Sequence, residues 1–486
     1  MANRQARSAK LVGLAAVLAL AACSPDEILE VEDIDVALPE AVQDATALPS
    51  ILAGAIGEFG VAYNGGGDFN VITLAGQLSD ELHNTETFPT RIEVDQRRQQ
   101  PQSNGSLRDL YYDVHQARAM AERAAAAYER LSPADVGHAE ALNLAGLTYI
   151  FFAENYCGAV PVSRELGPGN FEYGQMLSTT QLLDSAVAKA ARAQAIAQAV
   201  ADATTNSAAV RASGTAQVRL ARLVQARALL NLDRPADAAT IIGGEAGVPS
   251  NYQYIYRHSQ TTARQNNGTW AVTASVGRFG VPDREGGNGL PFRSEGDAAN
   301  TTSRDLRVPS ARRTNNQGRG FDNSTIQWIQ QKHATRDTLA IIADGVEARL
   351  IEAEAQLRAS NPVGALATLN ALRSNGTIAR QRGYLDANSQ PILLPNLTLQ
   401  ATPEAQVDQL FKERAYWLFL TGHRLGDLRR LIRTQAPGYA RGAETVFPTG
   451  NYHKSGTYGT DVNSPVPQAE ENNPNFQRSA CSATQA

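Results

Sequence analysis

Ionisable side chains that could take part in catalysis cluster at two places in the chain. Asp80-Glu81-Leu82-His83 could hold a metal ion or supply a pair of carboxylates, although loop carboxylates are more often solvated or cap helices. Farther on, Arg424 and Asp427 stand three residues apart, which on a helix is close enough for an ion pair. Glu413 and Arg414 lie one helix earlier and could join them. For this second cluster we favour a structural network that locks two helices together.

Sequence motifs of the common enzyme classes are absent. The chain contains no Gly-x-Ser-x-Gly, His-Glu-x-x-His, Gly-Lys-Ser/Thr or Cys-x-x-Cys run, and no lysine follows Gly65-Gly66-Gly67 to make a phosphate-binding loop. We therefore predict a protein that is not an enzyme and that holds no cofactor and no metal. A helical glycoside hydrolase is an alternative, and it would require two carboxylates about 5 to 9.5 Å apart across a cleft.

Aromatic and amide side chains favour carbohydrate binding instead. Sugars present C–H faces that stack on aromatic rings, and hydroxyls that pair with amide, carboxylate and guanidinium groups. Two polar stretches, 63–91 and 248–336, are rich in such side chains and supply the ligand-binding residues that we predict: Tyr63, Phe69, Asp80, His83, Asn84, Arg91, Trp270 and Trp328. The alternative for each ring is packing against the helices. If Trp328 contacts ligand, Trp328→Ala should weaken binding and leave thermal stability unchanged.

Helical periodicity covers most of the remaining chain. Apolar residues recur at intervals of three and four over 107–131, 135–156 and 179–203, which predicts three helices. The third is rich in alanine, and small side chains allow neighbouring helices to approach closely. We predict a mostly α fold of tetratricopeptide-like helical hairpins with a large irregular insert and few short strands.

An internal repeat supports this architecture. Residues 221–238 align without gaps with residues 348–365, and eight positions are identical, among them Pro235 and Pro362. Each copy reads as a helix with a seam of small residues, a polar turn, and a proline at the start of the next helix, where its missing N–H costs nothing. This pattern is typical of tetratricopeptide-like hairpins. Coincidence between two alanine-rich helices is the alternative.

The first residues indicate export. Arg4, Arg7 and Lys10 precede apolar residues 11–22, a run too short to span a bilayer, for which about 20 residues are needed. The run ends in Leu20-Ala21-Ala22-Cys23, which resembles a bacterial lipobox and implies cleavage before Cys23 and lipidation of this cysteine. An ordinary signal peptide is the alternative. An acidic tether follows, and no second stretch approaches 18 apolar residues.

Charge and cysteine content limit the possible partners. The formal net charge of −5 would fall to −8 without the signal, so the chain has no basic surplus for binding nucleic acid. Besides Cys23, only Cys157 and Cys481 are present. Outside the cytoplasm these two could form a disulfide that ties the C-terminal tail to the body, or they could remain two buried or free thiols.

In this order, the features resemble the RagB/SusD family of outer-membrane nutrient-binding lipoproteins over nearly the whole mature chain. The resemblance rests on the lipobox, the two hairpins and three further motifs: the turn at 156–161 after an aromatic helix, the late motif at 412–430 containing Gly422-His423-Arg424, and the closing Pro465-Val466-Pro467 with Asn472-Asn473-Pro474. The chain departs from the family in having Trp or Leu in place of an acidic residue before Gly422, and in its cysteine pair.

The resemblance implies that the protein binds a glycan or peptide and delivers it, without catalysis, to a SusC-like TonB-dependent transporter. It implies an outer-membrane location with a lipid anchor at Cys23, facing the cell surface. We expect a signal peptide at 1–22, a tether at 23–43 and a single body at 44–486. Within the body, 107–245 and 337–433 are hairpin regions, 248–336 is the ligand-binding insert and 434–486 is a tail. A membrane-anchored adaptor that binds only proteins is the alternative.

Overall fold

Helices dominate the residues that the computed structural model describes, which are 44–167, 170–294 and 305–486. The longer helices are α3 (Leu48–Asn64), α6 (Gly105–Leu131), α7 (Val136–Asn155), α8 (Thr179–Asp202), α9 (Ala208–Asn231), α13 (Gly345–Arg358), α14 (Pro362–Arg373), α16 (Pro403–Trp417) and α17 (Arg424–Arg433). The shorter ones are α4 (Val71–Leu78), α5 (Pro89–Asp95), α10 (Pro235–Ile242), α11 (Gly244–Gly247), α12 (Gly268–Trp270), α15 (Gly376–Gln381) and α18 (Ala443–Val446). The prediction of a mostly α fold is confirmed. The expected signal peptide, tether and Cys23 lie outside the described residues.

The three predicted helices correspond to α6, α7 and α8, and local capping explains where two of them begin. Asp135 caps α7, with its carboxylate accepting a hydrogen bond from the Gly137 N–H. Ser178 caps α8 in a reciprocal capping box with Gln181. These signals act within a few residues, so the sequence pattern alone was enough to find the helices.

The internal repeat is reproduced in backbone detail, which favours true repetition over coincidence. Pro235 and Pro362 each open the second helix of their hairpin, α10 and α14. The turns before them contain left-handed residues at the same alignment position, Asp233 (φ 61°) and Ser360 (φ 57°). In both turns the amide of the next residue donates a 2.9 Å hydrogen bond to a carbonyl five residues back. The two copies therefore share one helix–turn–helix geometry.

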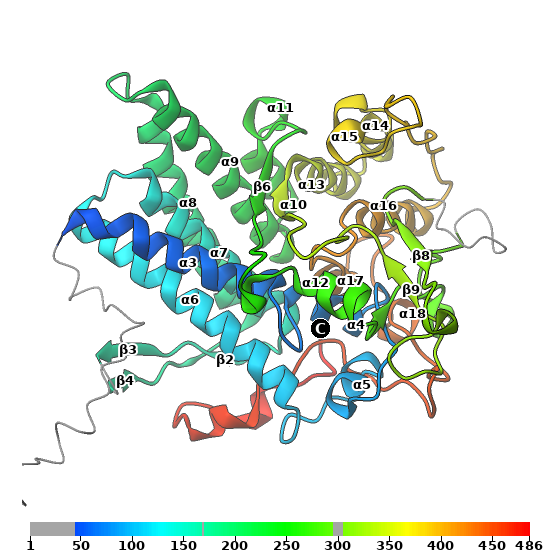
Figure 1. Cartoon of the computed structure of the whole chain (residues 1–486). Coiled ribbons are helices and arrows are strands. Elements are labelled where there is room, and N and C mark those ends of the chain that lie inside the picture. The colour runs from blue at the N-terminus through cyan, green and yellow to red at the C-terminus, as the bar shows by residue number, and fades with distance from the viewer. Residues whose placement is uncertain (1–43, 168–169, 295–304) are drawn as a thin grey trace, which may run out of the picture. The chain divides into compact units, whose positions relative to one another are not determined.

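Small side chains hold the long helices together. In Figure 1, α3, α6, α7, α8 and α9 lie side by side. Along α8 the alanines that face the neighbouring helices are fully buried: Ala186, Ala190, Ala193 and Ala197. Gly214 of α9 lies so close to α8 that a Cβ atom there would come within 2.8 Å of the Ala201 backbone nitrogen. The alanine-rich helix therefore packs as the sequence predicts.

Short antiparallel strand pairs order the insert between the two hairpins. Its strands β6 (Gln253–Tyr256), β7 (Phe279–Gly280), β8 (Ser310–Arg312) and β9 (Trp328–Gln330) pair as β6 with β10 (Ala340–Asp344), β7 with β1 (His83–Asn84), and β8 with β9. Two further pairs lie between α7 and α8, namely β2 (Val160–Pro161) with β5 (Met176–Leu177) and β3 (Arg164–Gly167) with β4 (Asn170–Glu172). Because β1 comes from the early polar stretch, its pairing with β7 joins that stretch to the insert.

The chain before α6 differs from the sequence-based expectation in two ways. The helix Ala45–Asn64 is long and apolar enough on average to span a membrane by length and composition, although it is not an unbroken apolar run. The second half of α3 is nevertheless largely buried against α6 and α7, with Phe59 and Tyr63 fully covered, which is typical of a core helix. The early polar stretch also contains α4, whose eight residues are all buried.

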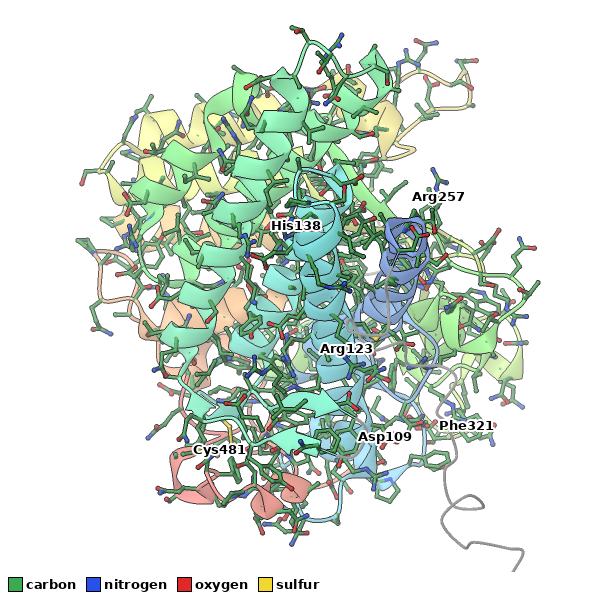
Figure 2. All side chains as sticks on the ribbon, turned by 90° about the vertical axis from the view of Figure 1, so that its left-hand side faces the viewer. Asp109, Arg123, His138, Arg257, Phe321 and Cys481 are labelled. Carbon is green, nitrogen blue, oxygen red and sulfur yellow. A yellow bond between two sulfur atoms is a disulfide. The ribbon has the colours of Figure 1, made fainter. Side chains whose placement is uncertain are left out.

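A disulfide joins the C-terminal tail to the helical body. Cys157, just after α7, is bonded to Cys481, and Figure 2 shows the bond as a yellow link at the label Cys481. The same tail is also fixed by backbone hydrogen bonds: Cys157 N–H donates to Ser464, and Ser464 N–H donates to Asn155. Residues 434–486 are therefore part of the body and not a free extension of it.

Candidate functional site

The two predicted rings of the early stretch are part of the core. Tyr63 is fully buried, and its hydroxyl donates to the Ile341 carbonyl at 2.6 Å. Phe69 is 4% exposed and stacks on Phe279 with 5.9 Å between ring centroids. Neither ring presents a face to solvent, so the structure contradicts their predicted role as stacking surfaces. The reason is long-range packing, because Tyr63 stacks on Phe151 of α7 and Phe69 on Phe279 of the insert.

Three predicted polar ligands are likewise occupied by protein partners. Both oxygens of Asp80 accept from Arg424, at 2.6 and 2.9 Å, and Asp80 is fully buried. Asn84 is fully buried, and its Oδ1 accepts from the Glu86 N–H at 2.9 Å, although its Nδ2 has no hydrogen-bond partner among the described residues. Arg91 is 5% exposed and pairs with Glu86 and Asp68. These side chains position the loop, and direct contact with a ligand is not available to them in this arrangement.

The two predicted tryptophans differ from each other. Trp328 on β9 is 8% exposed, belongs to the main core, and is covered by the Arg293 guanidinium 4.8 Å from the ring. The structure therefore contradicts its role as an open stacking surface. Trp270 is half-buried at the end of α12, which Asn267 caps, so part of its ring stays accessible.

Of the Asp80-Glu81-Leu82-His83 run, only His83 lies among other ligand-type side chains. Its ring centroid is 5.0 Å from that of His453, and Glu285 completes the group. Burial lowers the pKa of His83 well below its usual value, so the ring is neutral at pH 7. Burial also raises the pKa of Glu285, and the neighbouring Asp95 raises it further.

A stack of two exposed rings and a guanidinium, which the sequence did not single out, is the clearest candidate for ligand contact. Phe88 is 45% exposed and Phe321 is 43% exposed. The Arg278 guanidinium carbon lies 5.0 Å from the Phe88 ring and 4.7 Å from the Phe321 ring. Figure 2 shows Phe321 at the surface, where its label stands. Other rings of the chain are exposed too, such as Phe171, but here two rings flank one guanidinium, and contiguous apolar patches often mark binding sites.

Four loop segments meet at this stack, and we call them together the loop face: residues 84–91, 277–280, 320–325 and 453–454. Backbone hydrogen bonds join them, because Thr85 N–H donates to Arg278 and its own carbonyl accepts from Asp322. Phe321 N–H donates to Gly277. The early stretch, the insert and the tail thus share one surface.

Buried charges fix the donors of the loop face. Glu86, with no exposed side-chain area, pairs with Arg91 at 2.8 Å and with Arg278 at 2.5 Å. Burial alone would raise the pKa of Asp322, but hydrogen bonds from Lys454 and Thr325 lower it to about 2. The face therefore carries oriented guanidinium and carboxylate groups beside its rings, a combination that suits hydroxyl-rich ligands.

The late motif forms a buried network, as the structural interpretation predicts, but the partners differ. Asp427 accepts from Arg414 at 2.8 Å and from Arg430 at 2.9 Å, so both of its oxygens are occupied. The predicted ion pair between Arg424 and Asp427 is therefore wrong, since Arg424 pairs with Asp80 instead. Glu413 belongs to a separate group, in which it pairs with two arginines, Arg307 and Arg373. Glu413 thus holds α16 on the insert and on α14, whereas Arg424 holds α17 on the early stretch.

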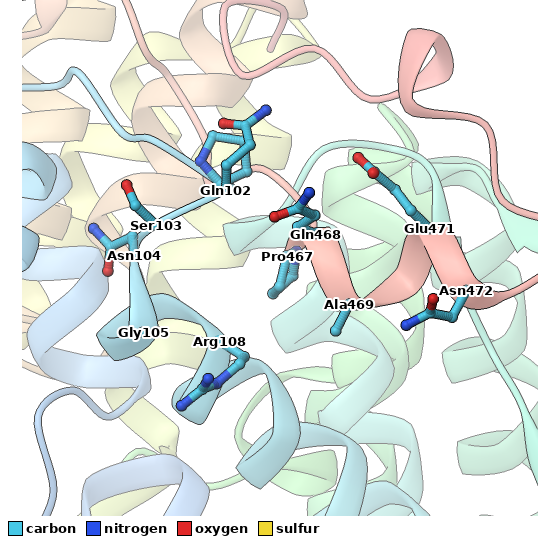
Figure 3. Close-up of a pocket in the computed structure, with 11 residues that line it drawn as sticks. Gln102, Ser103, Asn104, Gly105, Arg108, Pro467, Gln468, Ala469, Glu471 and Asn472 are labelled. Atoms are coloured by element: carbon cyan, nitrogen blue, oxygen red, sulfur yellow. The ribbon is translucent and has the colours of Figure 1, made fainter.

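A surface hollow between the start of α6 and the tail is a poorer candidate. Figure 3 shows that residues 102–108 line one side and residues 467–472 the other. Its volume is about 410 Å³, and no aromatic side chain lines it. Arg108, its one cationic lining residue, is paired with Asp109. The hollow therefore lacks the ring faces that a sugar needs.

Solved structures share this fold at low sequence identity. A SusD-like carbohydrate-binding protein from Bacteroides fragilis NCTC 9343 is 17% identical, with a TM-score of 0.59, over 89% of this chain and 99% of that chain. A second one, from Bacteroides vulgatus ATCC 8482, is 13% identical, with a TM-score of 0.58, over 90% and 98%. A SusD/RagB family protein from Bacteroides thetaiotaomicron VPI-5482 is 14% identical, with a TM-score of 0.53, over 78% and 86%. No family model and no curated protein matches the sequence. The fold is therefore SusD-like.

Proposed function

We propose that this protein is a SusD/RagB-type lipoprotein of the outer membrane that binds a glycan at the loop face. It passes the glycan to a SusC-like TonB-dependent transporter and performs no catalysis itself. A peptide is the second ligand class. Two neighbours that share the fold are described as carbohydrate-binding, which supports the glycan. The lipobox at residues 20–23 supports the anchor at Cys23.

The stack of Phe88, Arg278 and Phe321 carries the proposal. A pyranose ring buries one C–H face on an aromatic side chain, while its hydroxyls need fixed donors and acceptors nearby. The two rings supply the apolar surface, and Arg278 supplies donors held in place by Glu86. Trp270 and His83, both half-buried, remain candidates for further contacts.

An exported location agrees with the disulfide between Cys157 and Cys481, because disulfides persist in oxidising compartments. Lipidation at Cys23 would place the body beside the membrane without a spanning helix. Metabolic labelling with a palmitate analogue tests this part. We expect label in the wild type and none in Cys23→Ala, and label in both would contradict the anchor.

Calorimetric titration with a panel of oligosaccharides and a panel of short peptides tests ligand binding. We expect saturable binding of at least one oligosaccharide, weakened about tenfold by Phe88→Ala or Phe321→Ala. Phe171→Ala is the matched control, because Phe171 is 52% exposed on β4, outside the loop face. Equal loss in all three variants, or binding unchanged in all three, would contradict the proposed site. Release of shorter products from a bound oligosaccharide would contradict the absence of catalysis.

A protein-binding adaptor is the second candidate, and the matched hairpins α9–α10 and α13–α14 favour it. Stacked helical hairpins commonly present a surface to other proteins. Silence toward both ligand panels, together with capture of a protein partner by the hairpins, would support the adaptor. An adaptor that binds proteins through its hairpins does not need the exposed stack at the loop face, and we therefore rank the adaptor second.

A further inference from the structure

Three metal-ligand side chains converge next to the loop face from three distant parts of the chain. His83 comes from β1, Glu285 from the insert and His453 from the tail. Each contributes one possible ligand atom, and the three atoms lie within 4.8 Å of one another. His453 is exposed, so an ion could enter from solvent.

Two of these side chains have buried atoms without a hydrogen-bond partner. The Nε2 of His83 and the Oε2 of Glu285 are both buried and unpartnered, and Glu285 as a residue is only 8% exposed. Buried polar atoms are almost always paired in folded proteins, and exceptions call for an explanation. A bound cation would pair both atoms at once.

The carboxyl groups of the cluster pair with tyrosine hydroxyls and not with cationic side chains. Glu285 accepts from the Tyr458 hydroxyl, and the nearby buried Asp95 accepts from the Tyr452 hydroxyl. Within the described residues neither carboxylate forms an ion pair with a lysine or arginine. Two cationic side chains act on the cluster from outside, but Lys454 pairs with Asp322 and Arg293 lies over Trp328. No lysine or arginine among the described residues therefore competes with a metal ion for Glu285.

His453 is already oriented for metal binding. Its Nε2 lies 2.8 Å from the Asn84 carbonyl oxygen, which can only accept a hydrogen bond. This contact assigns the hydrogen to Nε2 and leaves the lone pair on Nδ1. A histidine that donates its second ring N–H to a backbone carbonyl is the usual arrangement at metal sites.

We propose that His83, Glu285 and His453 bind a divalent transition-metal ion of the zinc type, with solvent in the remaining position. Two imidazoles and one carboxylate form a donor set that suits zinc, whereas calcium and magnesium prefer oxygen ligands only. Ligand atoms around tetrahedral zinc are about 3.4 Å apart, so small side-chain rotations would close the site. The ion would clamp the early stretch, the insert and the tail together. The site shares His453 with the loop face and His83 with the candidate glycan contacts, so zinc binding is measured without oligosaccharide.

Calorimetric titration of the tag-free full chain with ZnCl₂ tests the site. We expect one Zn²⁺ per chain, no comparable binding of CaCl₂ or MgCl₂, and an increase in melting temperature on adding zinc. His453→Gln and Glu285→Gln should each weaken zinc binding by about tenfold or more. Circular dichroism of both variants shows whether they fold, and because His453 is exposed, His453→Gln keeps the test valid if Glu285→Gln does not fold.

His138→Gln is the matched control, because His138 lies on α7 away from the cluster, with its Nδ1 3.0 Å from the Pro133 carbonyl. It should leave zinc affinity and stoichiometry unchanged. Absence of zinc binding by the wild type would overturn the proposal. Zinc binding of equal affinity in the wild type, His453→Gln and Glu285→Gln would overturn it as well. Neither result would affect the proposed glycan site.

Discussion

The late-motif network and the loop face differ in how their charged side chains are paired and covered. In the network, Asp427 has guanidinium groups on both oxygens and is buried with them between helices. At the loop face, Arg278 pairs with Glu86 but lies between two exposed rings. Next to this face, and within the described residues, Asp95 and Glu285 form no ion pair with a lysine or arginine. Where every charge is satisfied internally, a region has nothing left to offer a ligand. The difference therefore separates the scaffold from the surface available for binding.

Breaking the network should have the largest effect on stability. Asp427→Ala would leave Arg414 buried without its main partner, and we expect a loss of about 4 kcal/mol in the free energy of unfolding. Urea denaturation measures this loss. Glu172→Ala, which removes the exposed pair with Arg164, should cost less than about 1 kcal/mol. Similar losses in both variants would remove the distinction between buried and exposed pairs.

Trp328 should behave as part of the scaffold although it lies in the insert. Its ring is 8% exposed, so Trp328→Ala should cost about 3 kcal/mol through lost packing. The sequence had suggested the opposite outcome, unchanged stability with weaker binding. Thermal unfolding of the variant distinguishes a core role from a ligand-binding role. An unchanged melting temperature would contradict the core role and make Trp328 a candidate ligand contact again.

Glu81 is a buried carboxyl group that burial keeps in its neutral, protonated form. Burial raises its pKa from 4.5 to about 8, and its Oε2 has no hydrogen-bond partner. The folded chain keeps this proton between pH 4.5 and 8, where the unfolded chain has lost it, so stability should fall as pH rises through this window. Glu81→Gln removes the fall and should be more stable than wild type at pH 8 by an amount on the order of 2 kcal/mol.

Denaturation of wild type and Glu81→Gln at pH 5 and pH 8 checks this prediction. Burial lowers the pKa of Lys332 to about 7, and Lys332 interacts with Glu81, so the same two measurements in a Lys332→Met background separate the two groups. A difference that is as large at pH 5 as at pH 8 would show that Glu81 does not titrate in this window.

The smallest effect on stability is expected at the loop face. Arg278→Lys keeps the charge near Glu86 but loses the planar group that lies between Phe88 and Phe321. We expect a change in unfolding free energy below about 1 kcal/mol and severalfold weaker glycan binding. Paired unfolding and binding measurements on the variant test this expectation. A large loss of stability would place Arg278 with the scaffold.

Local signals explain why the helices were predictable and the site was not. The capping boxes, the alanine seam and the prolines of the hairpins act over a few residues, and the sequence displays them directly. Ring exposure depends on contacts between distant segments, such as β1 with β7 and Tyr63 with Ile341. The sequence shows which side chains are aromatic and not which of them are covered.

One local signal for the site was present but unused. Phe321 lies between Gly320 and Asp322-Asn323, and a ring within such turn residues has few apolar neighbours to cover it. By contrast, Trp328 and Phe279 lie in the strands β9 and β7, and both are buried. Weighting rings by their turn context would have selected Phe321 over Trp328.

Hydrogen exchange of the protein with and without a saturating oligosaccharide shows directly which segments the ligand covers. We expect slower exchange in residues 84–91, 277–280 and 320–325, and no change in the hairpins α9–α10 and α13–α14. Protection confined to the hairpins, with unaltered exchange across the loop face, would contradict this expectation.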